Sequence, residues 1–277
     1  MTNISRSTAL PLLIFSVAFT ARAEISEPRS EVVSVDDVAW GYLNPARGDK
    51  GPRAADLWGD RTKNTAAGIL LQFPEGFSSP PHIHNITYRG VVIQGELHND
   101  DPAAESMWLP AGSFWTQPAG EAHVTAANGK SNIAYIEINS GPYLVQPTGQ
   151  AFDNGERPVN VHPSNIVWLD SFSKDENSLS DVRIAYLWGD AAEGNLRGTM
   201  LKLPGSFEGT ISTNADEFKA IVIEGTIDYK NQQAMKKLEP GSYFGSTDHV
   251  VHEIAVNPGQ ASTLYIRSDN TYDILAN

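Results

Sequence analysis

The sequence predicts an all-β protein made of two similar halves. Short apolar runs rich in β-branched residues recur along the chain, and clusters of Gly, Pro, Asn and Asp separate them. No long segment has the apolar periodicity of a helix. Many short strands with turns every 8–12 residues or so are typical of a β-sandwich or barrel. The expected strands are 68–73, 87–93, 113–117, 132–138 and 142–145 in the first half, and 198–203, 218–223, 242–245 and 262–267 in the second.

The two halves are related by an internal repeat with an offset of 130 residues. The tetrapeptide Leu-Trp-Gly-Asp at 57–60 returns at 187–190, and the run 91–95 returns at 221–225. A constant offset shared by separated blocks indicates duplication rather than chance similarity. We therefore expect an N-terminal barrel over residues 24–147 and a C-terminal barrel over residues 148–277, joined by a linker near residues 146–158.

The first 23 residues, 1–23, are predicted to be a signal peptide. Arg6 gives a positive start, residues 9–20 form an apolar run, and Ala21-Arg22-Ala23 matches a cleavage site. The run is shorter than a membrane span of roughly 20 residues. The alternative is an apolar N-terminal strand. The mature protein is expected to begin at Glu24 and to be exported, either periplasmic or secreted.

Composition limits the possible partners. The chain has 33 acidic and 20 basic residues, a net charge of −13, and loss of Arg6 and Arg22 with the leader leaves −15. Such an acidic surface repels phosphate backbones and anionic lipid, so neither nucleic acid nor membrane is expected as a partner. The absence of cysteine excludes disulfides and thiolate ligands. A small-molecule anionic substrate would need a local positive centre, which a bound metal supplies.

Three histidines of the first half form the candidate site. His82 and His84 are two residues apart on an expected strand and therefore point to the same face. Imidazole nitrogens bind Zn, Fe, Cu, Ni or Mn, and a third histidine from a neighbouring strand would complete a triangle. A bare His-x-His pair would favour the alternative of solvent-facing or hydrogen-bonded core histidines.

Two segments resemble the two-part signature of the cupin superfamily: Gly76-x5-His82-x-His84-x3-Tyr88-x6-Gly95 and Gly112-x5-Pro118-x-Gly120-x2-His123. The stretches 77–85, 88–93 and 110–121 also resemble a family of bacterial two-domain cupins of unknown function. This resemblance covers nearly the whole mature chain and implies tandem double-stranded β-helix (jelly-roll) barrels. It implies one divalent transition metal held by His82, His84 and His123. It does not specify the chemistry, because cupins include dioxygenases, isomerases, decarboxylases, sensors and storage proteins.

Tyr88 and Ala127 stand where most metal-binding cupins have a glutamate ligand and an asparagine. Neutral tyrosine is a poor ligand at pH 7, since its pKa is about 10. A three-histidine site similar to that of some cupin dioxygenases is therefore expected. Such a site leaves the metal its full positive charge and favours a chelating enolate, carboxylate or catecholate. Tyr88 is the candidate catalytic residue that hydrogen-bonds the ligand; alternatively, its ring only fills the barrel.

Other residues near the motifs are assigned lesser roles. Arg89 is expected to face away from the barrel interior, as a surface or interface residue. His98 is expected at the rim rather than at the metal, followed by a polar loop over residues 99–106. Trp58 and Trp188, which recur in both halves, are expected to be structural.

The second half lacks the triad. Ser212 and Asn214 replace the first two histidines, Phe218 replaces the tyrosine, and His252 remains, with His249 nearby. A single histidine with serine and asparagine does not hold a transition metal tightly. The second barrel is expected to be a structural partner, with an additional ligand site as the alternative.

The sequence therefore predicts an exported two-cupin metalloprotein, of dioxygenase type, that acts on a small chelating anion. Two alternatives remain open: a non-redox isomerase or lyase, which would need a general base beside the metal, and a non-enzymatic binding module. A monomer or homodimer is expected, because a tandem pair can satisfy within one chain the contact through which single cupins dimerise.

Overall fold

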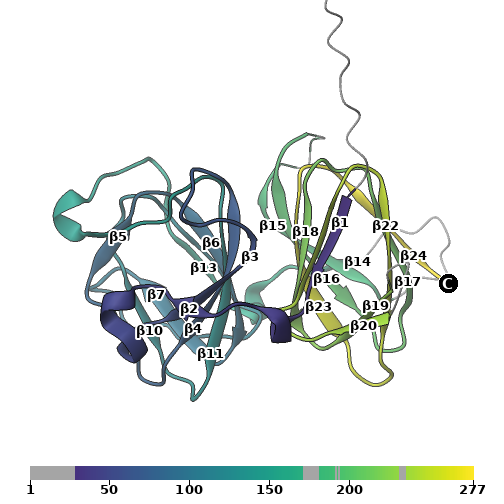
Figure 1. The fold of residues 1–277 in the computed structure, drawn as a ribbon, viewed down its shortest axis with the longest axis horizontal. Coiled ribbons are helices and arrows are strands. Elements are labelled where there is room, and N and C mark those ends of the chain that lie inside the picture. Colours follow the sequence, from purple (N-terminus) through teal and green to yellow (C-terminus); the bar gives the residue numbers. More distant parts are fainter. Residues whose placement is uncertain (1–28, 171–180, 191, 193, 231–234) are drawn as a thin grey trace, which may run out of the picture.

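Two β-barrels lie side by side in the computed structural model; in Figure 1 the first is coloured purple to teal, and the second is green to yellow apart from one purple strand that joins it. The structure describes residues 29–170, 181–190, 192, 194–230 and 235–277; the predicted leader, 1–23, lies outside them. The regular structure is almost entirely antiparallel strand, which confirms the predicted all-β fold with tandem barrels. In these residues no helix combines the length and apolarity needed to cross a membrane.

The first barrel is built on a seven-stranded sheet that faces the second barrel. Its strands, in spatial order, are β13 (Val159–Val161), β9 (Phe114–Gln117), β6 (Tyr88–Gln94), β11 (Asn132–Ile138), β4 (Ala67–Phe73), β3 (Arg53–Gly59) and β2 (Gly41–Tyr42). The opposite wall consists of β10 (Val124–Ala127), β7 (Glu96–Asp100) and β8 (Leu109–Pro110), and of the pair β12 (Val145–Pro147) and β5 (His82–His84).

The second barrel repeats this plan. Its seven-stranded sheet consists of β1 (Arg29–Val33), β21 (Tyr243–Thr247), β18 (Phe218–Glu224), β23 (Ser262–Ser268), β16 (Arg197–Leu203), β15 (Arg183–Gly189) and β14 (Leu169–Asp170). Its five-stranded sheet consists of β20 (Met235–Leu238), β19 (Ile227–Lys230), β22 (Val250–Val256), β17 (Glu208–Thr213) and β24 (Tyr272–Ala276). Short 3-10 turns connect the strands: η1 (Val35–Asp37), η2 (Pro45–Lys50), η3 (Thr148–Gln150) and η4 (Pro163–Asn165).

The strand register shows the same duplication. Arg53 lies opposite Gln72 in the first barrel, and Arg183 lies opposite Lys202 in the second, at the repeat offset of 130. Both pairs of strands are interrupted by a bulge just before the repeated tryptophan, Trp58 or Trp188. A bulge bends a strand and is a built feature of a fold rather than a defect.

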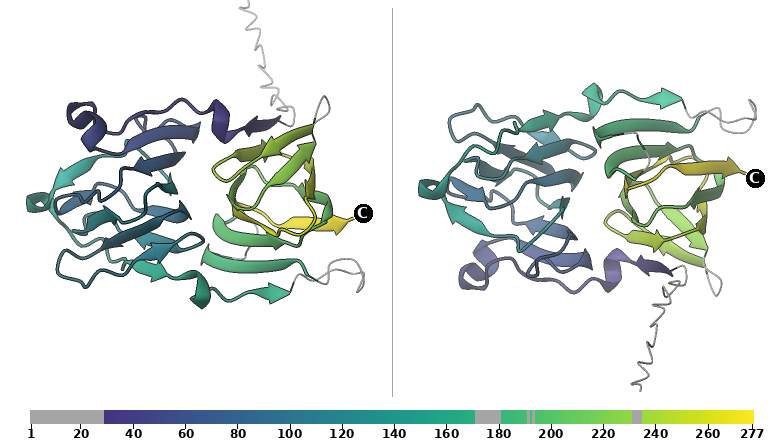
Figure 2. Two further views of the ribbon diagram at one scale, coloured as in Figure 1. Left: turned by 90° about the horizontal axis from the view of Figure 1, so that it is seen from below. Right: turned by 90° about the horizontal axis from the view of Figure 1, so that it is seen from above.

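Two strands cross between the barrels. β1 pairs with β21 in the second barrel, and β13 pairs with β9 in the first. The predicted division between residues 147 and 148 assigns β1 to the first barrel and β13 to the second. Each strand instead joins the sheet of the other barrel. The predicted linker, 146–158, folds along the first barrel, where the Phe152 N–H donates to the Gly120 carbonyl at 3.1 Å. The two crossing segments run along opposite sides of the molecule (Figure 2).

Two local expectations are wrong. Asn99 belongs to β7 rather than to the predicted loop 99–106, because its polar side chain is bonded inside the barrel instead of facing water. Most of the predicted strand 142–145 is irregular, and only Val145 joins β12. The Asn85 side chain bonds the Pro142 carbonyl and the Leu144 N–H, and so takes the place of a neighbouring strand.

The two seven-stranded sheets pack against each other through one apolar cluster drawn from both barrels. The indole N–H of Trp58 donates to the Tyr135 hydroxyl at 3.1 Å, and that of Trp188 donates to the Tyr265 hydroxyl at 2.8 Å. The two tyrosine rings lie 5.6 Å apart. The guanidinium of Arg89 lies 3.9 Å from the ring of Trp188, so its predicted place at an interface is confirmed. The repeated tryptophans are confirmed as structural.

A buried ion pair lies in this interface. Arg267, 1% exposed, is 3.3 Å from Glu137, 0% exposed, and also bonds Asn139 at 2.6 Å and Glu217 at 2.5 Å. Burial alone would lower the pKa of the guanidinium, but the two carboxylates outweigh it and raise that pKa above its usual value. Positions 137 and 267 are counterparts in the repeat. In a symmetric dimer of identical subunits the same residue would meet itself here and place two like charges together, whereas this chain places a glutamate against an arginine.

Replacing Arg267 with Met should destabilise the protein by about 3 kcal/mol, because it leaves the Glu137 carboxylate buried without its partner. Chemical denaturation of wild type and variant measures the change. The matched control is Lys230→Met, which removes an exposed pair with Glu253 and should cost less than about 0.5 kcal/mol. Combining Glu137→Gln with Arg267→Met should recover part of the lost stability, because the buried negative charge is then removed as well. Equal stability of R267M and wild type would show that the buried ion pair does not stabilise the interface.

Candidate metal centre

The backbone brings the three predicted histidines together. His82 and His84 lie on β5, and His123 directly precedes β10. His82 and His123 form an isolated β-bridge, with reciprocal backbone hydrogen bonds of 3.0 and 2.9 Å. The turn before His123 requires glycine at position 120, where φ is +78° and a Cβ atom would lie 2.4 Å from the Phe152 carbonyl.

The three imidazoles fit a metal ion. Their candidate ligand atoms all lie within 4.8 Å of one another. Each Nδ1 is hydrogen-bonded to a backbone carbonyl: His82 to Pro80 at 3.0 Å, His84 to Leu144 at 3.0 Å, and His123 to Glu121 at 3.1 Å. A carbonyl only accepts, so these bonds place the ring proton on Nδ1 and leave the Nε2 lone pair of each ring for a metal, as such partners do in metal sites.

Burial keeps these imidazoles neutral. His84 is 2% and His123 1% exposed, while His82 is half-buried. Burial, with the neighbouring histidines, holds the pKa of His84 well below its usual value and lowers that of His123 to about 3. Burial also lowers the pKa of His82. Neutral imidazole is the metal-binding form, so protons compete weakly for this site.

Tyr88 lies beside the triad as an uncharged phenol. It is buried on β6, and its hydroxyl donates to Asn99 Oδ1 at 2.9 Å and lies 3.4 Å from His123 Nε2. Burial raises the pKa of this phenol well above its usual value, although the neighbouring polar groups of Trp115, Asn99 and Thr125 oppose the shift. The residue in the usual glutamate position therefore brings no negative charge, in keeping with the expected three-histidine set.

A buried amide network that sequence reasoning missed supports Tyr88 and His123. Asn99 accepts from Tyr88 and Thr125 and donates to Gln117 Oε1 at 2.9 Å. Gln117 in turn donates to the Glu121 carbonyl at 3.2 Å, the same carbonyl that receives His123 Nδ1. The only sequence signal was that position 117 lies within the second motif; nothing marked Asn99.

Tyr143 was also missed. Its ring stacks on His84 with 4.4 Å between centroids, and its hydroxyl lies 3.2 Å from His84 Nε2. Burial raises the pKa of this phenol well above its usual value. Because Nδ1 of His84 carries the ring proton, the Tyr143 hydroxyl is the donor to Nε2. A metal bound at Nε2 takes the place of this hydrogen bond.

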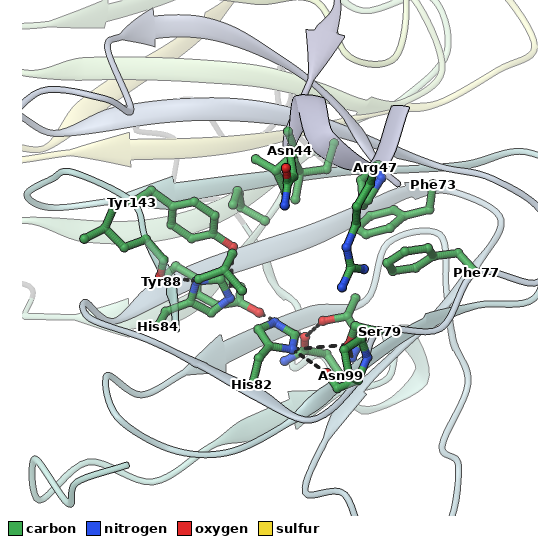
Figure 3. A pocket seen from close by; sticks show the side chains of 18 of the residues that line it. Asn44, Arg47, Phe73, Phe77, Ser79, His82, His84, Tyr88, Asn99 and Tyr143 are labelled. Atoms are coloured by element: carbon green, nitrogen blue, oxygen red, sulfur yellow. Dashed lines mark hydrogen bonds between the residues drawn. The ribbon is translucent and has the colours of Figure 1, made fainter. Parts of the chain in front are cut away.

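A cavity of about 340 Å³ opens over His82 and His84 (Figure 3). Its walls are mainly apolar, with Leu71, Phe73, Phe77, Trp115, Ile136 and Tyr143 among them. Among the described residues that line it there is no aspartate or glutamate, and Arg47 is the one arginine or lysine. The site therefore combines a possible metal position with a water-poor space for a small organic ligand.

His98 was expected at the rim, and this is wrong. It is 5% exposed, its ring packs on Trp108, and its Nδ1 lies 3.4 Å from the Met107 carbonyl. It precedes Asn99 on β7, so its side chain points to the opposite face from the buried amide network. It does not join the triad.

The corresponding region of the second barrel is filled. His252 is fully buried, with Tyr229 at 2.8 Å on Nδ1 and Ser246 at 3.0 Å on Nε2. Phe218 stacks on its ring with 5.1 Å between centroids. Burial lowers its pKa to about 4. Both ring nitrogens already have partners, and within the described ranges only the triad of the first barrel gathers three potential ligands.

The fold and this site define a two-barrel cupin with a buried three-histidine cluster in one barrel. The chain belongs to the family described as "Domain of unknown function (DUF4437)", whose model matches residues 31–275. No curated protein matches the sequence.

Several solved structures share the fold at low sequence identity. The chain is similar to the protein YlbA from E. coli, with 14% identity, a TM-score of 0.60, and coverage of 90% of this chain and 94% of that one. It is similar to a salicylate 1,2-dioxygenase from Pseudaminobacter salicylatoxidans, with 13% identity, a TM-score of 0.58, and coverage of 92% and 88%. It is also similar to the 7S globulin of Momordica charantia, with 11% identity, a TM-score of 0.54, and coverage of 89% and 86%.

Purified protein should carry one transition metal per chain, and His82→Ala or His123→Ala should lose it, because each substitution removes one of three ligands. Elemental analysis after gel filtration measures the content. His249→Ala, an exposed histidine of the second barrel, is the control and should keep the metal. Two tightly bound metals per chain, or full metal content in H123A, would contradict the single-site interpretation.

Proposed function

We propose that the protein is an exported, metal-dependent oxidoreductase of dioxygenase type that acts on a small chelating organic anion. One observation carries the proposal: three neutral imidazoles cluster with no carboxylate among them, and two of them, His82 and His84, line an apolar cavity of about 340 Å³. The fold alone does not supply it, since one fold hosts many chemistries.

The charge of the site favours an anion. Because none of the three histidines is negative and none of the described lining residues is acidic, a divalent ion held by the histidines would keep its full charge. A redox-active ion in this position would supply the one-electron chemistry that dioxygen requires. The chain supplies the other components: ligands, an apolar enclosure and a positioned phenol.

Tyr88 is suited to orient the ligand. Its hydroxyl is a neutral donor, held near the triad by Asn99. The Tyr88 hydroxyl can rotate and donate to a ligand oxygen instead of to Asn99 Oδ1. Asn99 Oδ1 then still accepts from the Thr125 hydroxyl at 2.8 Å, so this buried oxygen is not left unpaired. The apolar side chains of Leu71, Phe73 and Ile136 exclude water from the ligand, which strengthens each remaining polar contact.

The absence of a carboxylate also weighs against the main alternative. Isomerase or lyase chemistry at a metal needs a general base within hydrogen-bond reach of the substrate. The described lining residues include no aspartate or glutamate, and the triad histidines would be occupied as ligands when a metal is bound. Dioxygenase chemistry needs only ligand binding, metal and dioxygen.

Oxygen consumption tests the proposal. Protein stripped with a chelator is reloaded with Fe(II), Mn(II) or Zn(II) and assayed with an oxygen electrode against catechols, hydroxybenzoates and β-dicarbonyl compounds. We expect uptake of dioxygen with a redox-active metal and at least one of these compounds, and none with zinc or in His123→Ala protein. Turnover of a compound by the zinc form without oxygen would point instead to isomerase or lyase action. Ligand binding without any turnover would indicate a binding module.

Tyr88→Phe should keep the metal but lower turnover by about tenfold. The phenol is not a ligand, so metal content is unchanged, while the lost hydrogen bond to the bound anion is worth about 1.4 kcal/mol if it forms in the transition state. Metal analysis and steady-state kinetics on the same preparation separate the two effects. If Y88F protein loses its metal, the tyrosine is a ligand or an essential support, and the three-histidine assignment must be abandoned.

A further inference from the structure

We propose that Arg47 selects the substrate by pairing with its carboxylate, and that the ligand is a small, flat, apolar monocarboxylate whose remaining oxygens face the histidines. This inference rests on the proposed function, because it assigns the substrate class of the same site. Its basis is the place of Arg47 in the fold, the absence of any protein partner for its charge, and the shape of the cavity wall.

Arg47 lies on η2, in a short segment that covers the mouth of the cavity. The segment is closed at its base by the Leu43 N–H, which donates to the Pro52 carbonyl at 2.9 Å. Within it, the Asn44 side chain accepts from the Ala46 N–H at 3.0 Å, and Gly48 adopts a φ of +51° that favours glycine. The backbone that carries Arg47 is thus held by its own local bonds.

Arg47 is exposed at the cavity mouth, and its side chain turns from this segment toward the cavity. Figure 3 shows its guanidinium in the cavity beside Phe77, on the side of Ser79 and His82. Arg47, Ser79 and His82 all line the cavity. A ligand carboxylate at this guanidinium would therefore lie next to the metal position rather than at a remote part of the surface.

The charge of Arg47 has no protein partner. Within the described part of the chain its guanidinium makes no hydrogen bond and no ion pair, although the protein carries 33 acidic residues. The nearest acidic residue on its own segment, Asp49, accepts instead from the Tyr42 hydroxyl at 2.6 Å. A planar guanidinium binds a carboxylate through two parallel bonds, so an unpaired arginine aimed into a pocket fits this anion in particular.

The walls define the rest of the ligand. Phe73 and Phe77, with ring centroids 5.5 Å apart, lie together on one side of the Arg47 side chain, and Trp115 and Tyr143 also line the cavity. Aromatic surfaces of this kind favour a flat apolar body. The volume of about 340 Å³ is at the small end of ligand pockets, which suits a single ring or a short chain. A second carboxylate away from the metal would find no other cation among the described lining residues.

Binding of benzoate and of its uncharged analogue benzamide tests the inference without turnover. Quenching of tryptophan fluorescence gives the dissociation constants, since Trp115 lines the cavity. The protein is measured as purified and again after metal removal. In Arg47→Gln protein, benzoate should bind about tenfold more weakly and benzamide as in wild type. Arg47→Lys should lie between, because lysine keeps the charge but not the paired geometry.

Lys50→Gln is the matched control, since Lys50 is exposed on the same segment but does not line the cavity. It should bind both probes as wild type does. The inference is overturned if R47Q binds benzoate like wild type, if both probes weaken equally, or if wild type binds no benzoate. Arg47-dependent benzoate binding without oxygen uptake would sink the proposed function alone. Oxygen uptake with a carboxylate substrate whose KM is unchanged in R47Q would sink this inference alone.

Discussion

The contact between the two seven-stranded sheets is the constraint on which the rest of the molecule depends. Each sheet has one face toward its own barrel and one toward its partner, so neither is complete alone. At the centre, Arg267 meets Glu137, its own counterpart in the repeat. A pair of opposite charges at one symmetric position requires two sequences that differ there. A tandem chain meets this requirement, and its second barrel covers the outer face of the first barrel's seven-stranded sheet.

That asymmetry extends to the barrel interiors. In the second barrel, His252 is enclosed by Tyr229, Ser246 and Phe218, and its polar atoms are satisfied within the core. In the first, His82 and His84 line a cavity, and the Nε2 atoms of His84 and His123 lie against the hydroxyls of Tyr143 and Tyr88. A cavity and partly satisfied polar groups lower the stability of a barrel. At the corresponding position of the second barrel His252 is enclosed and hydrogen-bonded, so this loss does not arise there. The chain thus combines one barrel whose histidine is enclosed with one that contains a cavity beside its histidines.

Much of this was predictable from sequence, and the reasons differ by residue. The strands, the repeat and the triad follow from local periodicity and motif spacing, which is why His82, His84 and His123 meet as expected. Asn99 and Tyr143 gave no signal, because a buried polar residue looks like a loop residue until its partners are known. Arg47 lies 35 residues before the first histidine, and only the fold brings it over the cavity.

The crossing of β1 has a consequence for the order in which the molecule can form. β1 starts at Arg29, yet it pairs with β21, so Arg29 lies opposite Thr247 across nearly the whole chain. Contacts between such distant positions form late, because a long loop must close first. During synthesis β1 therefore has no strand to pair with until β21 has been made. A fragment ending at residue 147 would lack β13, and one starting at residue 148 would lack β1. Each barrel thus contains a strand from beyond the division, so no single cleavage of the chain leaves both barrels with all their strands.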